Sequence, residues 1–183
     1  PRPIKVSIDT QMNPNTPDFH EIVLAHAEES LFPARSEASN EEELQTVYRK
    51  FLKTEKERIK DAHMEGASGL DVAAWKSALV DVVINDHYST SGIANGPTPY
   101  TLVASGGYGR GLLNPGSDID LQFILHANCN DKALQKIADS IRPLLTMLYD
   151  AGFSVGHGVR TIKESTRFAN QDHPTKTALL DAR

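Results

Sequence analysis

The feature that most constrains this chain is a glycine-rich segment between two strand-like runs, residues 100–125. Residues 101–104 are apolar or β-branched and lead into Gly106 and Gly107, which is typical of a buried strand that ends in a tight loop. Glycines lack the Cβ atoms that would keep a ligand away from backbone N–H groups, and such groups can hold phosphate oxygens. The segment therefore predicts a strand, a phosphate-binding loop and a second strand.

Two carboxylates stand at the start of the second predicted strand. From Asp118 the sequence alternates, so that Asp118, Asp120 and Gln122 fall on one face and apolar residues on the other. Backbones two residues apart in a strand are separated by roughly 6.6 Å, and carboxylate oxygens are ligands that Mg²⁺ or Mn²⁺ accepts. Without a cation, two such charges about 5 Å apart repel by roughly 3 kcal/mol in a partly screened environment. The pair is therefore a candidate metal site and catalytic site, although Asp-x-Asp alone is also common at strand edges.

The order and spacing of these residues resemble a known family. Two glycines, about ten residues and then Ser-Asp-Ile-Asp-Leu are similar to the signature of nucleotidyltransferases of the polymerase β superfamily. GGYGRG with the following DIDL, and then LYDAGFSVGHGVRTIKES and TALLDAR, resemble more narrowly the N-terminal nucleotidyltransferase domain of the bifunctional PII uridylyltransferase/uridylyl-removing enzymes. The resemblance covers about residues 103–183. One residue departs from it: the family usually has an acidic residue straight after GRG, where this chain has Leu112.

The resemblance implies a fold and a reaction. The fold is α/β (α+β), polymerase β-like, with a small mixed sheet flanked by helices and an added N-terminal helical layer. The reaction is the Mg²⁺- or Mn²⁺-dependent transfer of UMP from UTP to a tyrosine of the PII nitrogen-regulatory protein. Another NTP or another protein or small-molecule acceptor is an open alternative. A catalytically silent nucleotide-sensing module is a further one, which Leu112 favours.

Three polar residues are candidates for binding the nucleotide beside the glycine loop. Ser117 is expected to join Gly106 and Gly107 in holding β and γ phosphate oxygens. Arg110 either pairs with phosphate or braces the loop. Arg160, on a strand predicted from the alternation that begins at residue 153, is a candidate for the triphosphate charge because a guanidinium is permanently charged and matches phosphate oxygens.

A third metal ligand is left open. In the superfamily the strand that begins near residue 153 commonly carries a third carboxylate, but this chain has Gly156 and His157 there. Asp172 or Asp181 could supply the missing ligand, or the site could work with two carboxylates. The missing strand carboxylate also favours the silent module.

Composition limits the class of protein. With 183 residues and 39% apolar content, the chain can form one core with an accessory helical layer. The net charge of −5 and the lack of a basic tract argue against nucleic-acid binding. A single cysteine, Cys129, excludes an internal disulfide, and we find no membrane-length apolar run and no signal peptide. We therefore expect a soluble, cytoplasmic protein.

The helical pattern divides the chain into three parts: an N-terminal arm and short helix (1–39), a helical layer (40–98) and the nucleotidyltransferase core (99–183). Pro33 is expected to end the short helix, and Pro143 to kink or split the long helix predicted from residue 131. Thr175 is expected to cap the last helix. The two chain ends lead us to expect a fragment of a longer protein, truncated at the C-terminal end of the core.

Overall fold

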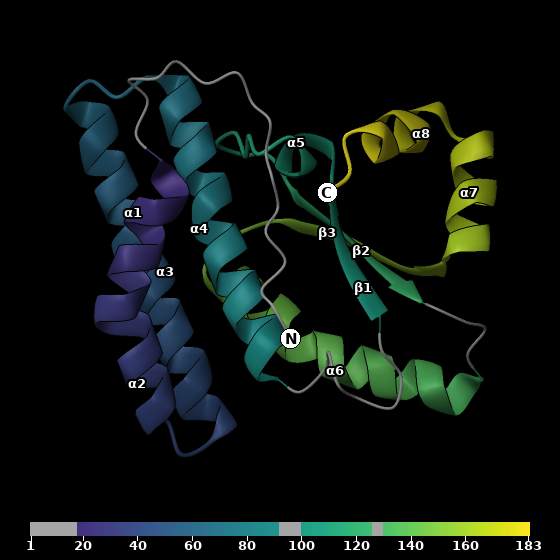
Figure 1. Ribbon diagram of the computed structural model, residues 1–183, viewed down its shortest axis with the longest axis horizontal. Coiled ribbons are helices and arrows are strands. Elements are labelled where there is room, and N and C mark those ends of the chain that lie inside the picture. The colour runs from purple at the N-terminus through teal and green to yellow at the C-terminus, as the bar shows by residue number, and fades with distance from the viewer. Residues whose placement is uncertain (1–17, 92–99, 126–129) are drawn as a thin grey trace.

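The computed structural model describes residues 18–91, 100–125 and 130–183 (Figure 1). In chain order the elements are α1 (Phe19–His26), the π-helical turn η1 (Ala27–Leu31), α2 (Phe32–Glu37), α3 (Glu41–Met64), α4 (Gly69–Thr90), β1 (Tyr100–Ser105), α5 (Gly106–Gly109), β2 (Ile119–Leu125), α6 (Asp131–Asp150), β3 (Val155–Thr161), α7 (Ile162–Gln171) and α8 (His173–Leu180). The expected arm over residues 1–17 lies outside the described residues. The small mixed sheet flanked by helices is confirmed.

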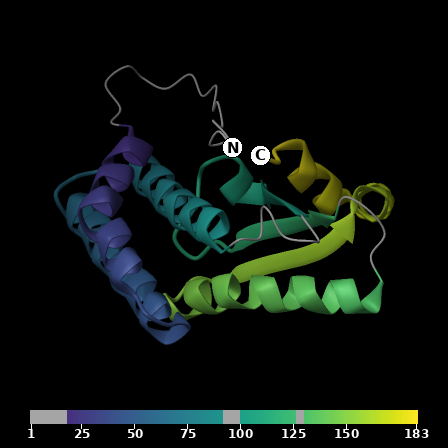
Figure 2. The same cartoon turned by 60° about the horizontal axis from the view of Figure 1, so that its bottom comes forward.

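The sheet has the strand order β1-β2-β3, with β1 antiparallel and β3 parallel to the central strand β2. Along β2 every second residue is buried, and the residues between them are only partly covered. The buried set is Ile119, Leu121, Phe123 and Leu125. Helix α6 makes the crossover from β2 to β3 and runs along one face of the sheet (Figure 2). The opposite face carries the polar residues of β2.

Helix α4 joins the helical layer to the sheet. On one side it packs against α1 and α3, and Trp75 stacks on Phe19 with ring centroids 5.3 Å apart. On the other side its Ala73 carbonyl accepts a hydrogen bond from the Leu113 N–H at 3.0 Å. Because α4 is covered on both sides, apolar residues occur on more than one of its faces. The N-terminal helical layer is thus attached directly to the segment between α5 and β2.

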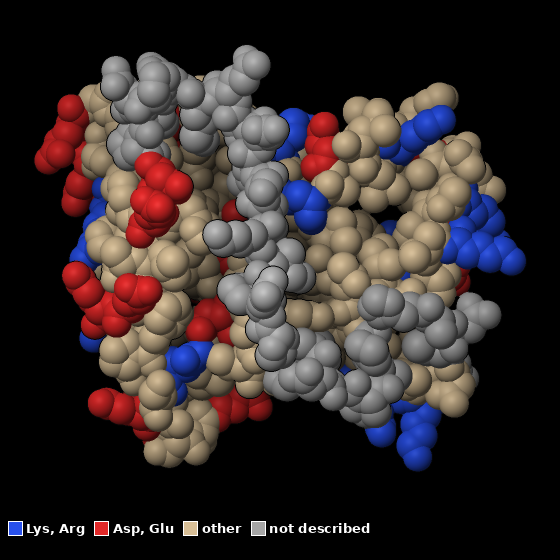
Figure 3. All heavy atoms as spheres, in the orientation of Figure 1, with Lys and Arg blue, Asp and Glu red and all other residues tan. Residues whose placement is uncertain are grey.

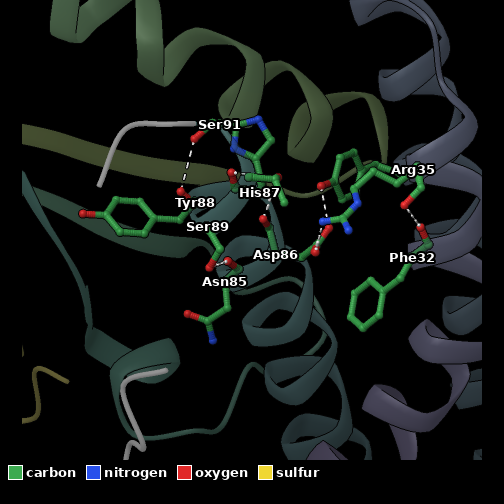
Figure 4. A network of polar contacts seen from close by, with 11 residues as sticks. Phe32, Arg35, Asn85, Asp86, His87, Tyr88, Ser89 and Ser91 are labelled. Carbon is green, nitrogen blue, oxygen red and sulfur yellow. Dashed lines mark hydrogen bonds and ion pairs between the residues drawn. The ribbon is translucent and has the colours of Figure 1, made fainter. Parts of the chain in front are cut away.

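A buried polar network holds the helical layer together (Figure 4). Arg35 of α2 forms an ion pair with Asp86 of α4, and the Tyr48 hydroxyl of α3 donates to the same carboxylate at 2.6 Å. Burial, with Asp86 beside it, raises the pKa of Tyr48 well above its usual range. Burial lowers the pKa of the neighbouring His87. One carboxylate therefore ties three helices together.

Two expectations about helix ends, at Pro33 and Thr175, were wrong, and one of the two alternatives for Pro143 is excluded. Pro33 does not end the first helical segment, because η1 shifts the hydrogen-bond register and Pro33 falls in the first turn of α2, where no N–H is needed. Pro143 does not split α6, which is assigned without a break. The last helix, α8, is capped by Asp172 rather than by Thr175, whose N–H donates to the Asp172 carboxylate at 2.9 Å.

Candidate active site

The Asp120 carboxylate lies between two glycines. In the sheet, Asp120 is opposite Ser105 of β1 and Gly156 of β3. A Cβ atom built on Gly106 would lie 2.5 Å from Asp120 Oδ2, and one built on Gly156 would lie 2.9 Å from Oδ1. Gly106 also has a φ of 62°, which side-chain-bearing residues rarely adopt. The two glycines therefore leave the space that this carboxylate occupies, whereas the sequence marked Gly106 as part of the loop and Gly156 only as a position that lacks a carboxylate.

Asp118 stands just before β2, where it is exposed, and Ser117 precedes it in a turn closed by its N–H and the Asn114 carbonyl at 3.0 Å. Partial burial, and then the charge of Asp118, raise the pKa of Asp120 above its usual value. Two carboxylates that repel each other across an open face are a site that a cation would stabilise. Within the described part of the chain, no cluster of three or more His, Cys, Asp or Glu is placed to hold a metal.

The two candidates for a third ligand have other partners in the structure. Asp172 caps α8 and accepts hydrogen bonds from the Thr175 hydroxyl and the Thr175 N–H, and these two bonds lower the pKa of the Asp172 carboxyl. Asp181 pairs with Arg110 at 2.9 Å. Gly156 stands directly opposite Asp120, so the strand position beside the pair carries no side chain. Of the four candidate carboxylates, the fold therefore brings Asp118 and Asp120 together as a pair.

The glycine loop is a single helical turn, α5, and is more tightly packed than an open loop. Gly107 does not have a positive φ, and a Cβ there would lie 3.2 Å from the Leu112 carbonyl oxygen. A Cβ on Gly109 would lie 2.6 Å from the Asp181 carbonyl oxygen. Arg110 reaches the same C-terminal segment through its pair with Asp181. This geometry supports the bracing role for Arg110.

A buried ion pair behind the turn was missed in the sequence. Arg183 donates to both carboxylate oxygens of Asp81 in α4, each at 2.9 Å. The Tyr108 hydroxyl donates to Asp81 at 2.7 Å, and burial raises the pKa of Tyr108 well above its usual range. The Arg183 backbone also exchanges two hydrogen bonds with Ala104 of β1. These contacts, called the Asp81 brace below (Asp81, Tyr108, Arg183), fix the turn between the sheet and α4.

Arg160 lies on the same face as Asp120. It is opposite Ile124 in the sheet, and its Nη1 donates to Gln122 Oε1 at 2.9 Å. Its guanidinium stacks over the ring of Phe168 in α7, 4.6 Å from the centroid. His157 alternates with these residues and is opposite buried Leu121, so it belongs to the other face.

Comparisons with known proteins show the family to which this chain is related. Bifunctional uridylyltransferase/uridylyl-removing enzymes match most of the chain: that of Nitrobacter winogradskyi is 34% identical over 161 residues (82% of this chain), that of Caulobacter vibrioides 38% over 135 residues (70%), and that of Bradyrhizobium sp. 32% over 177 residues (91%). The chain fits a domain of this enzyme family. It spans only 17%, 14% and 18% of the length of these uridylyltransferases. No family model matches it.

On the face of this uridylyltransferase-like domain that Figure 3 draws, the charges are unevenly distributed. Figure 3 shows acidic side chains mainly over the helical layer and basic ones over α7 and α8, where Lys163, Arg167 and Lys176 are exposed. A cavity of about 540 Å³ lies between α2 and α3, but Glu37, Glu42 and Glu43 are among its lining residues and would repel a polyphosphate. In the described part of the chain, no helix is long and apolar enough to cross a membrane.

We expect Gly106→Ala to reduce nucleotide transfer much more than Gly111→Ala does. Both glycines have positive φ, 62° and 74°, so each substitution should cost about 1 kcal/mol of stability through backbone strain. Only the Cβ at residue 106 would meet Asp120, because nothing lies within 4 Å of one at residue 111. Urea unfolding and transfer rates measured on both variants test this. Equal rates in the two would show that the contact with Asp120 does not matter.

The raised pKa of Asp120 predicts how its replacement changes stability with pH. A carboxyl whose pKa is higher in the folded state than in the unfolded state favours folding at low pH, and this contribution is lost as pH rises through the folded-state pKa. The unfolding free energy of metal-free Asp120→Asn should therefore exceed that of wild type at pH 7, by about 1 kcal/mol or less because Asp120 is partly exposed to solvent. The difference should shrink towards pH 4. Denaturant unfolding at both pH values measures it, and a difference independent of pH would contradict the prediction.

Proposed function

We propose that this domain is a metal-dependent nucleotidyltransferase that transfers UMP from UTP to a tyrosine of a PII-type nitrogen-regulatory protein. The observation that carries the proposal is the Asp118–Asp120 pair at the start of β2, with Asp120 held against the glycine turn. The names of the relatives support uridylyl transfer as the reaction. The nucleotide, the acceptor and the metal are parts of this proposal.

Asp118 and Asp120 would hold Mg²⁺ or Mn²⁺. The donor set fits such a hard cation, because it consists of carboxylate oxygens whose mutual repulsion the cation would relieve. A bound cation supplies neutralisation of the charge that develops on the departing pyrophosphate. The two aspartates would fix the position of the cation, since Asp118 directly precedes β2 and Asp120 is the second residue of that strand.

The remaining residues bind and orient the nucleotide. The N–H groups of Gly106 and Gly107 belong to the first turn of a helix, where backbone donors have no partner within the helix. Together with the Ser117 hydroxyl they can donate to phosphate oxygens, and Arg160 adds a fixed positive charge on the same face. The acceptor hydroxyl would attack the α-phosphorus, forming a new P–O bond as the bond to pyrophosphate breaks and the hydroxyl proton leaves.

The test is incorporation of label from UTP, radiolabelled at the α-phosphate, into a PII-type protein in the presence of Mg²⁺. We expect label on wild-type acceptor, none on an acceptor whose tyrosine is replaced by Phe, and none after chelation of the metal. Parallel reactions with ATP, CTP and GTP determine the base. Label on other proteins or on small molecules would favour a different acceptor.

The catalytically silent sensing module is the second candidate. Leu112 and the bare strand position at Gly156 favour it, because both remove a carboxylate that the resemblance leads one to expect. Binding of UTP with no incorporation into any acceptor would establish this alternative.

A further inference from the structure

Arg160 is held in place by three neighbours on the open face of the sheet. Gln122 accepts a hydrogen bond from Nη1 at 2.9 Å, and Phe168 lies under the guanidinium. The third neighbour is Gly158, which has no side chain. A Cβ atom there would clash with Arg160 Nη1 and would lie 2.8 Å from Gln122 Oε1. The Arg160 side chain therefore folds back over β3 because residue 158 is a glycine.

This arrangement fixes the guanidinium close to the candidate active site. Gln122 is two residues beyond Asp120 on the same face of β2, which corresponds to roughly 6.6 Å along the strand. A guanidinium has five N–H donors. Within the described residues, the Arg160 guanidinium makes one hydrogen bond, to Gln122. The remaining donors are available to a ligand on this face.

The chemistry of Gln122 determines what that ligand can be. An amide oxygen orients the guanidinium but leaves its charge in place, whereas a carboxylate at this position would neutralise it. The Glu164 carboxylate is near enough for the charge of Arg160 to help lower its pKa, but within the described residues Arg160 forms no ion pair with a carboxylate. A positioned guanidinium of this kind matches the oxygens of a phosphate group.

We propose that Gln122 is a positioning residue that holds Arg160 for contact with a phosphate group of the nucleotide, and that Gly158 is required for the same reason. This inference rests on the proposed function for the identity of the substrate. It adds two residues, Gln122 and Gly158, and among the hydrogen bonds of the described residues none joins either of them to Asp118 or Asp120. It also assigns Phe168 a role as the stacking platform for the guanidinium.

The main test is a double-mutant cycle on equilibrium binding of Mg²⁺–UTP and of inorganic tripolyphosphate by the 183-residue chain. Gln122→Ala should weaken the binding of both ligands by about tenfold, the worth of one charge-assisted contact. In an Arg160→Ala background, the same substitution should change binding by less than about twofold, because a positioning residue has nothing left to position. Gln122→Glu should weaken binding as much as Arg160→Ala does. The control Gln135→Ala, which removes a glutamine that bonds Asp139 on the surface of α6, should change nothing.

Glycine variants provide a second, independent test. Gly158→Ala should reproduce the loss seen with Gln122→Ala, and Gly69→Ala, where a Cβ would meet nothing within 4 Å, should bind like wild type. Melting temperatures of all variants check that the fold is retained. Unchanged binding in Gln122→Ala, or an equal loss in both Arg160 backgrounds, would overturn the inference. Coupled binding without label transfer would reject the proposed function alone, and transfer without the coupling would reject only this inference.

Discussion

Asp120→Asn is expected to slow nucleotide transfer by at least a hundredfold to a thousandfold while the protein remains folded. The substitution removes one of the two carboxylates that would hold the metal, and each ~1.4 kcal/mol of lost transition-state stabilisation costs a factor of ten in rate. The neutral amide has nearly the same shape, so the space between Gly106 and Gly156 stays filled. Single-turnover transfer from labelled UTP measures the loss.

Thermal unfolding separates this metal role from a structural one. Mg²⁺ with UTP should raise the melting temperature of wild type, because a ligand that binds only the folded state stabilises it, and this shift should nearly vanish in Asp120→Asn. Asp139→Asn, a change at an exposed carboxylate of α6, should keep both the shift and the transfer rate. If Asp120→Asn instead lowered the melting temperature of the metal-free protein and kept the Mg²⁺ shift, Asp120 would be a hydrogen-bonding residue of the turn.

Local sequence patterns predicted the central strand and the start of the long helix α6. The alternation after Asp118 has period two, and β2 shows the same alternation of buried and partly covered residues. Ser68 and Thr161 each start a helix with a capping box, in which the donor and acceptor lie three residues apart and need no help from the rest of the fold. Such signals are short-range, and they are enough to place Asp118 and Asp120 two residues apart at the start of one strand.

The surroundings of the site could not be predicted in this way. That Gly156 lies opposite Asp120, and Gly158 beside Gln122, depends on the register between β2 and β3, which is set after the 20-residue crossover helix α6. The same limit applies to Asp172, whose side chain could have been a metal ligand or a cap. Asp172 directly precedes α8, so its carboxylate can accept from the free N–H groups of the first turn of that helix. This local contact makes it a helix cap in the structure.

The Asp81 brace gives the second large prediction: Asp81→Ala should lower the free energy of unfolding by about 3–5 kcal/mol. The carboxylate accepts from Arg183 and from the Tyr108 hydroxyl, and the side chains of the ion pair are only 13% and 15% exposed. Its loss leaves the guanidinium of Arg183 largely buried without its countercharge. That amount is a large share of the stability of a typical domain. Urea unfolding measures it, and exposed Asp61→Ala in α3 is the matched control, with an expected change within about 0.5 kcal/mol.

Two further variants show whether the ion pair itself carries this stability. Tyr108→Phe removes one hydrogen bond and should cost only about 1 kcal/mol. Asp81→Leu combined with Arg183→Met removes both charges together and should cost much less than Asp81→Ala, because no buried charge is left without a partner. Amide hydrogen exchange at residues 106–109 should speed up in Asp81→Ala, since Arg183 also donates to the carbonyls of Tyr108 and Gly109. If Asp81→Ala were as stable as the Asp61 control and exchange in the turn were unchanged, α4 would not be what holds the glycine turn beside Asp120.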